Sequence, residues 1–129
     1  MAKGPSENQH QMAVFKWSQQ ARIRQKWPEL KLLFHIPNER NCTPKQGKLF
    51  QLMGVRRGVP DLFLPVPRGR YHGLWIEMKA EDGDTTGDQE WWGEQLMAQG
   101  YAWEVCHGWE SAARVLEWYM SLSDGTAHE

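Results

Sequence analysis

The hydrophobic positions of this 129-residue chain fall into short runs whose spacing predicts alternating helices and strands. Two runs stand out, at 58–64 and 74–79, separated by a stretch rich in proline and glycine that cannot continue paired strands. They predict an antiparallel hairpin with a long tip. Because side chains alternate along a strand, the apolar residues of both runs share one face. That face comprises Leu62, Leu64, Leu74, Ile76 and Met78.

The opposite face of the predicted hairpin is charged. Pairing the two strands symmetrically about Gly69 places Asp61 opposite Glu77, with Lys79 on the same face. Two carboxylates directly opposite each other destabilise a ladder, and a divalent cation held by both would compensate. Lys79 would then be close enough to steady an attacking water or the charge that develops on a phosphorane. The hairpin thus indicates a hydrolytic phosphodiesterase site, the alternative being an exposed ladder with ordinary surface charges.

The remaining apolar periodicity predicts further elements on both sides of the hairpin. Thr86 with Gln89 is a capping-box pattern that starts one of the helices, and Pro28 ends another. The predicted helices cover 12–27, 43–53, 86–99 and 109–122, the additional strands cover 30–36 and 101–106, and flexible tails are expected at 1–11 and 123–129. With the hairpin, these elements define an α/β protein whose mixed β-sheet is flanked by helices.

Two further expectations concern side chains within these elements. His35 lies in an apolar strand and is predicted to be a core histidine rather than a metal ligand, and no second histidine at ligand spacing supports zinc. The helix at 43–53 is expected to face the core. Its core face consists of Leu49, Phe50, Leu52 and Met53.

Composition restricts the class of protein. With 40% hydrophobic residues and eight tryptophans, the chain suits a single domain with a substantial core. No run approaches the roughly 20 apolar residues of a membrane span, and the polar start is unlike a signal peptide, so we expect a cytoplasmic protein. Cys42 and Cys106 lie far apart without a CxxC partner, which predicts reduced thiols rather than a disulfide or a zinc site.

The charges are unevenly distributed along the chain, although the net charge is only -1. Residues 1–76 carry 13 Lys and Arg against 4 Asp and Glu, whereas residues 77–129 carry 2 against 12. The basic half, residues 1–76, is suited to binding a phosphate backbone. The alternative is that the two halves interleave in the fold and largely neutralise each other.

A family resemblance rests on the same hairpin. Pro60-Asp61, followed by Glu77-Met78-Lys79, resembles the bipartite signature of the PD-(D/E)XK nucleases. The surrounding residues extend the likeness over roughly 32–120 to the VRR-NUC branch, the virus-type replication and repair nuclease domain, in its small standalone phage or bacterial form. These surrounding residues are Met53-Gly54-Val55, Gly58-Val59, Gly73-Leu74, Gln89 and Gly100-Tyr101.

The resemblance implies a restriction-endonuclease-like αβββαβ core, here with an extra helix after the first strand and a C-terminal helix, within a domain at 12–122. It also implies a Mg²⁺- or Mn²⁺-dependent deoxyribonuclease. Asp61 and Glu77 would bind the metal, with the Met78 carbonyl as a further ligand. Lys79 would orient or deprotonate the attacking water.

Other residues are expected to assist. The resemblance implies an auxiliary acidic residue, which Glu39 fits best, although a turn carboxylate paired with Arg40 is an alternative. It also places Gln89 beside the active site, whereas the helix cap alone would explain that residue equally well. Candidate DNA contacts, which as exposed charges could instead be merely solvated, are Arg56, Arg57, Arg68, Arg70, Lys45 and Lys48.

The expected substrate is DNA, branched or otherwise structured, such as a Holliday junction in replication, recombination or repair. Because one active site cuts one strand, a homodimer is expected where two symmetric incisions are needed. Three alternatives stay open. They are a non-catalytic nucleic-acid-binding module of the same fold, a sequence-specific restriction-like nuclease, and a protein-interaction domain that uses Trp91, Trp109 and Trp118.

Overall fold

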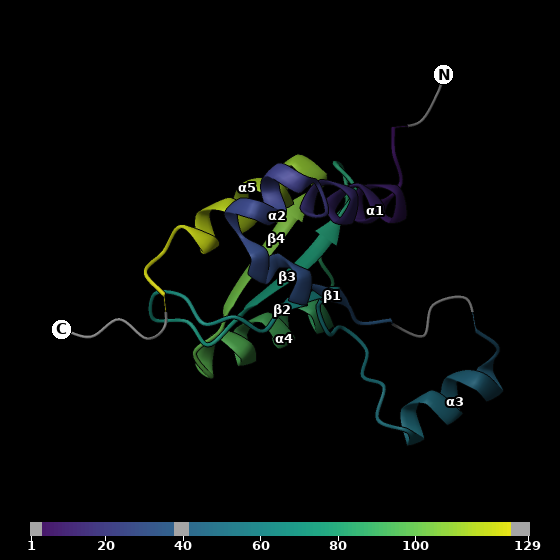
Figure 1. The fold of residues 1–129 in the computed structure, drawn as a ribbon. Coiled ribbons are helices and arrows are strands. Elements are labelled where there is room, and N and C mark those ends of the chain that lie inside the picture. Colours follow the sequence, from purple (N-terminus) through teal and green to yellow (C-terminus); the bar gives the residue numbers. More distant parts are fainter. Residues whose placement is uncertain (1–3, 38–41, 125–129) are drawn as a thin grey trace.

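The computed structural model describes residues 4–37 and 42–124 (Figure 1). In chain order its elements are α1 (Glu7–Ser18), α2 (Ala21–Lys26), the 3-10 helix η1 (Pro28–Leu32), β1 (Phe34–His35), α3 (Pro44–Leu52), β2 (Leu62–Leu64), β3 (Leu74–Lys79), α4 (Gly87–Ala98), β4 (Ala102–His107) and α5 (Trp109–Met120). The predicted α/β class, a mixed sheet flanked by helices, is confirmed.

The four strands form one sheet in the order β1-β2-β3-β4. β2 pairs antiparallel with both β1 and β3, whereas β3 and β4 run parallel. Leu62 lies opposite Ile76, which is the register predicted from symmetry about Gly69. Figure 1 shows α1, α2 and α5 on one side of the sheet and α4 on the other.

The core lies between the sheet and the pair α1 and α5. All five apolar side chains of the predicted hairpin face are fully buried there, beside Val14 of α1 and Leu116 of α5. Each such side chain contributes roughly 1.5–3 kcal/mol when removed from water. The Tyr119 hydroxyl donates a 2.6 Å hydrogen bond to the Val66 carbonyl, which ties α5 to the chain that leaves β2. The hairpin is therefore a fixed frame for the residues on its opposite face.

The first helix differs from its prediction. It begins at Glu7 instead of Met12, because Ser6 and Gln9 form a capping box that starts the helix inside the predicted tail. It ends at Ser18, and extended backbone at Gln20 separates it from α2. The prediction of a single helix at 12–27 was therefore wrong, and two helices replace it, with Val14 of α1 and Ile23 of α2 in the core.

The segment predicted as a strand at 30–36 begins with the end of the 3-10 helix η1 and contains only the two-residue strand β1. Pro28 occupies the first turn of η1, and the buried residues Leu30 and Leu33 are spaced three apart, which suits three residues per turn. Only two residues, Phe34 and His35, pair with β2. His35 is exposed, so its prediction as a core histidine was wrong. Its Nδ1 lies 2.9 Å from the Asp61 carbonyl instead.

The helix α3 forms where it was predicted, but it does not face the core. Thr43 and Gln46 make its capping box, and Gly54 follows its end with a positive φ of 99°. None of its residues is buried. The predicted core face was therefore wrong, and α3 stands apart from the sheet in Figure 1.

The two cysteines lie in different parts of the structure, Cys42 before α3 and Cys106 in β4. Cys42 and Cys106 form no disulfide, as predicted, and burial raises the pKa of the Cys106 thiol to about 12. Within the described ranges 4–37 and 42–124, every helix is too short or too polar to cross a membrane.

The packing of α4 on the sheet depends on a glycine. A Cβ added at Gly93 would overlap the indole ring of Trp103 on β4. We expect Gly93→Ala to lower the free energy of unfolding by up to about 2 kcal/mol, because overpacking costs about 1–3 kcal/mol and the gain in helix propensity returns only roughly 1 kcal/mol. Urea unfolding followed by circular dichroism measures the difference. Gly87→Ala is the matched control, since nothing lies within 4 Å of its added Cβ. Equal stability of the two variants would contradict the close packing.

Candidate active site

Two acidic side chains meet at one end of the hairpin, on the face opposite the core. Continuing the observed register by one residue from Leu62 and Ile76 brings Asp61 beside Glu77. Both are buried, with 4% of Asp61 and 1% of Glu77 exposed. The alternative of an exposed ladder with ordinary surface charges therefore does not hold. Buried carboxylates of like charge are costly unless other groups compensate them.

The backbone of neighbouring strands fixes Asp61. Its carbonyl accepts a 2.8 Å hydrogen bond from the Ile36 N–H and is contacted by His35 from β1. Its side-chain Oδ2 accepts a 2.8 Å hydrogen bond from the Met78 N–H of β3. Asp61 is thus held from both sides, and its position does not depend on a flexible loop.

The two oxygens of Glu77 have different surroundings. Oε2 accepts a 3.1 Å hydrogen bond from Gln89 Nε2 and lies 3.8 Å from the ammonium of Lys79, itself only 5% exposed. Oε1 is buried, and no N–H or O–H group of the other described residues donates a hydrogen bond to it. One oxygen is therefore held by the protein and the other remains able to bind a ligand.

The electrostatic surroundings favour a protonated Glu77. Burial raises the pKa of Glu77 to about 9, and the charge of Asp61 and a hydrogen bond to it act in the same direction. The Lys79 ammonium opposes this rise in the pKa, and the charge of Glu7 adds to it. At neutral pH the metal-free carboxyl therefore carries a proton that a bound cation would displace.

Gln89 acts both as a helix cap and as a site residue. Its Oε1 accepts a 2.9 Å hydrogen bond from the Thr86 N–H, and Thr86 Oγ1 accepts one from the Gln89 N–H, which completes the predicted capping box. Its Nε2 still donates to Glu77. Gln89 can therefore be both a helix cap and a residue beside the carboxylate pair, because its side-chain amide carries an acceptor and a donor.

Glu7 was missed from the sequence, where it fell in the predicted tail. It lies in the first turn of α1, and its charge raises the pKa of Glu77, which places it within electrostatic reach of the pair. The capping box of Ser6 and Gln9 was the signal that could have found this helix start. Glu39, the predicted auxiliary acid, lies outside the described residues.

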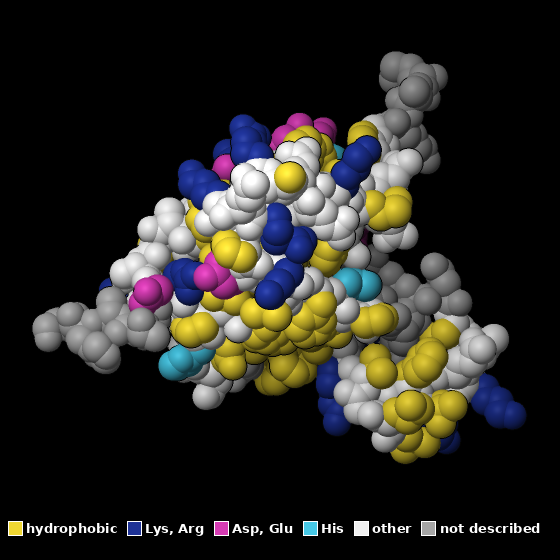
Figure 2. Space-filling view, in the orientation of Figure 1, with side chains coloured by type: hydrophobic (Ala, Val, Ile, Leu, Met, Phe, Trp, Pro, Cys, Tyr) yellow, Lys and Arg dark blue, Asp and Glu magenta, His cyan; other side chains and the backbone are white. Residues whose placement is uncertain are grey.

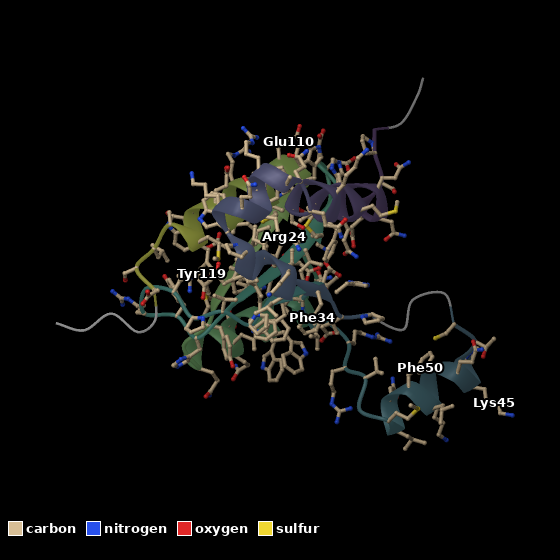
Figure 3. All side chains as sticks on the ribbon, in the orientation of Figure 1. Arg24, Phe34, Lys45, Phe50, Glu110 and Tyr119 are labelled. Carbon is tan, nitrogen blue, oxygen red and sulfur yellow. The ribbon has the colours of Figure 1, made fainter. Side chains whose placement is uncertain are left out.

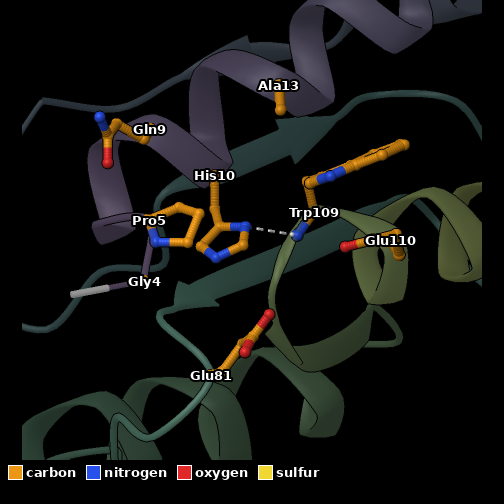
Figure 4. A pocket seen from close by; sticks show the side chains of 8 residues that line it. All are labelled: Gly4, Pro5, Gln9, His10, Ala13, Glu81, Trp109 and Glu110. Atoms are coloured by element: carbon orange, nitrogen blue, oxygen red, sulfur yellow. Dashed lines mark hydrogen bonds between the residues drawn. The ribbon is translucent and has the colours of Figure 1, made fainter. Parts of the chain in front are cut away.

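A contact between α1 and α5 holds α1, the helix that carries Glu7, in place (Figure 4). His10, buried at 3% exposure, accepts a 3.0 Å hydrogen bond at Nδ1 from the Trp109 N–H, and so caps α5 where Gly108 has no side chain. The ring lines a surface cavity of about 530 Å³ shared with Glu81 and Glu110. Because Glu7 is one helical turn before His10, this contact also sets the position of Glu7.

The arrangement suits a hard divalent cation. Carboxylate oxygens are the ligands that Mg²⁺ and Mn²⁺ prefer, and Glu77 Oε1 is an oxygen without a partner within the described structure. The part of the chain that the structure describes has no cluster of three or more His, Cys, Asp or Glu side chains close enough to hold a metal ion. Water and backbone oxygens would have to complete such a coordination shell, as is usual for Mg²⁺.

The predicted DNA contacts fall into separate groups. Arg56 and Arg57 are exposed in the loop after α3, and the Arg57 carbonyl accepts a 3.0 Å hydrogen bond from Trp92 Nε1 of α4. The next residue, Gly58, packs against the backbone of Asp88. This loop is therefore anchored at the start of α4, next to Gln89 and the carboxylate pair. Lys45, labelled in Figure 3, and Lys48 lie on the separate helix α3.

The hairpin tip lies at the opposite end of β3 from Glu77. Arg68 is 3.3 Å from Glu29 and also donates a 2.8 Å hydrogen bond to the Pro67 carbonyl. The Gly69 N–H donates to the Ser123 carbonyl at 2.7 Å, which ties the tip to the chain after α5. Arg70 is exposed at this same end. The structure therefore does not bring Arg68 and Arg70 together with the carboxylate pair.

Comparison with known proteins identifies the family of this fold. The fold and the site define a nuclease-like α/β domain. The family model described as "VRR-NUC domain" matches residues 15–110. A solved structure described as "VRR_NUC domain protein" is similar over 95% of this chain and 94% of that chain, with a TM-score of 0.79 and 32% identity. No curated protein matches the chain significantly. The chain belongs to the VRR-NUC family, which confirms the predicted resemblance.

The raised pKa of Glu77 predicts how the stability of the metal-free protein changes with pH. The folded-state pKa of about 9 exceeds the ordinary 4.5, so the stabilisation from the bound proton is complete below about pH 4.5 and is lost as pH rises through 9. In a chelating buffer, the melting temperature should fall by roughly 4 °C or more over this range. Glu77→Gln should make the melting temperature nearly independent of pH over this range. Glu117→Gln, on the exposed side of α5, should leave the pH dependence of the wild type unchanged. A decline unchanged in Glu77→Gln would refute the assignment.

Proposed function

We propose that this VRR-NUC domain is a Mg²⁺- or Mn²⁺-dependent endonuclease that hydrolyses phosphodiester bonds in branched DNA, such as Holliday junctions formed in replication, recombination or repair. The observation that supports this most directly is the buried pair of Asp61 and Glu77, with one carboxylate oxygen unpartnered and Lys79 beside it. A protein without catalytic use for this pair would be more stable with apolar residues there.

The metal would be held by Asp61 and Glu77, with the Met78 carbonyl as a proposed further ligand. When bound, such a cation supplies Lewis-acid polarisation of the phosphoryl group and lowers the pKa of a bound water. The chain prepares the ligands beforehand. The Met78 N–H holds one oxygen of Asp61, and Gln89 holds one oxygen of Glu77. The remaining oxygen of Glu77 is thereby oriented before any ligand arrives, which reduces the cost of binding.

Lys79 would act on the nucleophile or on the developing charge. Its buried ammonium has three donors and no acceptor, and it lies 3.8 Å from Glu77 Oε2. A buried ammonium near the reacting phosphate stabilises negative charge more strongly than an exposed one, because less water screens it. In this proposal Lys79 orients the water and stabilises the phosphorane as the ammonium, or accepts the proton of the water as the neutral amine. Glu7 and Gln89 influence the pKa and the orientation of Glu77.

DNA would be held through its phosphates. The loop of Arg56 and Arg57 is anchored to α4 beside the carboxylate pair, so a substrate backbone bound at the pair would lie near two guanidinium groups. Lys45 and Lys48 of α3 would extend this basic surface. Arg68 and Arg70 could contribute only where the DNA reaches the far end of the hairpin. Phosphate contacts carry no sequence information, so the proposed enzyme reads structure rather than bases.

A homodimer would supply two such sites. One carboxylate pair per chain hydrolyses one phosphodiester bond at a time, whereas resolving a four-way junction requires two symmetric incisions. A second chain related by two-fold symmetry provides the second site without any new chemistry.

Two substitutions should separate metal binding from chemistry. Asp61→Asn should abolish measurable Mg²⁺ binding and cleavage together, because the amide lacks the negative charge that holds the cation. Lys79→Ala should retain Mg²⁺ and DNA binding but lose at least about a hundredfold in cleavage rate, because it removes charge stabilisation in the transition state. Calorimetric Mg²⁺ titration beside cleavage of branched, flapped and linear DNAs measures both.

Lys31→Ala, on the exposed surface of η1, is the control and should behave as the wild type. Full cleavage by Asp61→Asn would exclude the site and favour a different nuclease centre. Metal and DNA binding by the wild type without cleavage of any substrate would instead favour the non-catalytic binding module.

The mode of DNA binding predicts a salt dependence. Arg56→Ala with Arg57→Ala should lower the slope of log K against log salt by roughly 2, because each lost phosphate contact with duplex DNA removes about 0.9. The loss should be equal on junctions of shuffled sequence. Arg22→Ala with Lys26→Ala, two exposed charges on α2, is the matched control and should keep the wild-type slope. Strong preference for one base sequence over shuffled junctions would support a restriction-like nuclease.

A further inference from the structure

His10 holds a buried hydrogen-bond donor that the described chain leaves unused. The ring is only 3% exposed, and its Nδ1 accepts the 3.0 Å hydrogen bond from the Trp109 N–H. A ring nitrogen that accepts a hydrogen bond carries no proton, so the proton of the neutral imidazole lies on Nε2. Nε2 is also buried, and no acceptor of the other described residues receives a hydrogen bond from it. Because an unpaired buried donor costs stability, this N–H group requires an explanation.

The unused donor lies at the cavity between the starts of α1 and α5. Figure 4 shows the second ring nitrogen of His10 turned away from Trp109, toward the space between Pro5 and Glu81. The volume of about 530 Å³ falls within the roughly 300–1,000 Å³ that is typical of ligand pockets. Two exposed carboxylates, Glu81 and Glu110, line the cavity together with the indole of Trp109. Figure 2 shows acidic side chains gathered at this end of α5, where Figure 3 labels Glu110.

This cavity adjoins the candidate active site. Glu81 follows Lys79 by two residues, and the Gly108 N–H, directly before α5, donates a 2.9 Å hydrogen bond to the Lys79 carbonyl. On α1, His10 lies about one helical turn, roughly 5.4 Å, beyond Glu7, which is within electrostatic reach of the carboxylate pair. A DNA strand with a phosphate at the carboxylate pair could therefore place the base of that nucleotide or of a neighbour in the cavity.

The side chains that line the cavity disfavour simple ions. A metal cation would find no lone pair on His10, because Nε2 carries the proton and Nδ1 already accepts a hydrogen bond. A phosphate or another anion would be repelled by Glu81 and Glu110. A neutral group fits if it presents an acceptor to the His10 N–H and a donor to a carboxylate. The pairing edge of each of the four DNA bases combines such an acceptor with such a donor.

We propose that this cavity binds one unpaired base of the DNA substrate. The inference rests on the proposed function, because it names the feature of branched DNA that the enzyme recognises. His10 Nε2–H donates to an acceptor of the base, and Glu81 or Glu110 accepts from an N–H group of the base. The indole of Trp109 offers a surface for stacking, and the phosphates stay outside the carboxylates. In a duplex the pairing edge is occupied by the opposite base, so the cavity distinguishes unpaired from paired strands without reading sequence.

DNA binding in a chelating buffer, in which no metal-dependent cleavage occurs, tests the proposal. The probe is a duplex with a single-stranded arm, and an abasic analogue replaces each nucleotide of the arm in turn. At one position near the branch, loss of the base should weaken binding by the wild type at least about tenfold, because a stacked and hydrogen-bonded base is lost. His10→Asn should reduce this ratio below about threefold, since the amide oxygen can still accept from the Trp109 N–H but the ring donor is gone. Glu81→Ala with Glu110→Ala should reduce the ratio similarly.

The ratio of the affinities for the intact and the abasic arm is the readout, because removing acidic side chains strengthens DNA binding in general and the ratio cancels that effect. Glu94→Ala with Glu117→Ala, two exposed acidic residues of α4 and α5 outside the cavity, is the matched control and should keep the tenfold ratio. Circular dichroism verifies folding, and the exposed Glu81 and Glu110 decide the test if His10→Asn does not fold.

The proposal is overturned if no position of the arm depends on its base. It is also overturned if the tenfold ratio persists in the folded cavity variants, which would place the bound base elsewhere on the protein. Strand nicking with Mg²⁺ is assayed separately on the same DNAs. Nicking without dependence on a base would refute this inference alone, whereas base-dependent binding without nicking would refute the proposed activity alone.

Discussion

The repulsion between Asp61 and Glu77 is the constraint on which the rest of the structure depends. The antiparallel register of β2 and β3 forces the two carboxyls together, and burial removes the water that would screen them. Neighbouring groups partly offset this repulsion. A backbone N–H donates to Asp61, and the amide of Gln89 and the ammonium of Lys79 lie against Glu77. None of these groups neutralises the pair completely, since the pKa of Glu77 stays raised to about 9. The metal-free protein therefore holds a proton on Glu77 at the point where a cation could replace it.

Each helix near the site has a start that serves this arrangement. The cap of α4 positions Gln89, the cap of α1 positions Glu7, and the α5 start is capped by His10 from α1. Helix starts suit this task because they combine unpaired N–H groups with local side-chain hydrogen bonds, so the backbone and the first-turn residues are fixed together. The site is therefore built from element ends and not from long loops, which limits the movement of its side chains.

The sequence was most informative where local rules act alone. Strand alternation identified the faces of the hairpin, and the Thr86 and Gln89 pattern identified the start of α4, because both depend on neighbouring residues. The sequence was misleading where tertiary packing decides. The residues of α3 look like a core face, yet they are exposed, since periodicity shows that a helix is amphipathic but not what covers it. Glu7 was missed because a polar stretch resembles a tail until its capping box is recognised, and its closeness to Glu77 depends on how α1 packs on α5.

The double use of Gln89 has a consequence for how the protein responds to heat and to mutation. The first turn of a helix is where fraying begins, and the carbonyl and the amino group of this one side chain join that turn to Glu77. Local fraying of α4 would release the carboxylate from its orientation while the sheet and core remain folded. Function would then fade at temperatures at which the global fold still persists. Substitution of Gln89 therefore affects folding and catalysis together. A shorter, longer or charged side chain at this position would disturb both the helix cap and the hydrogen bond to Glu77.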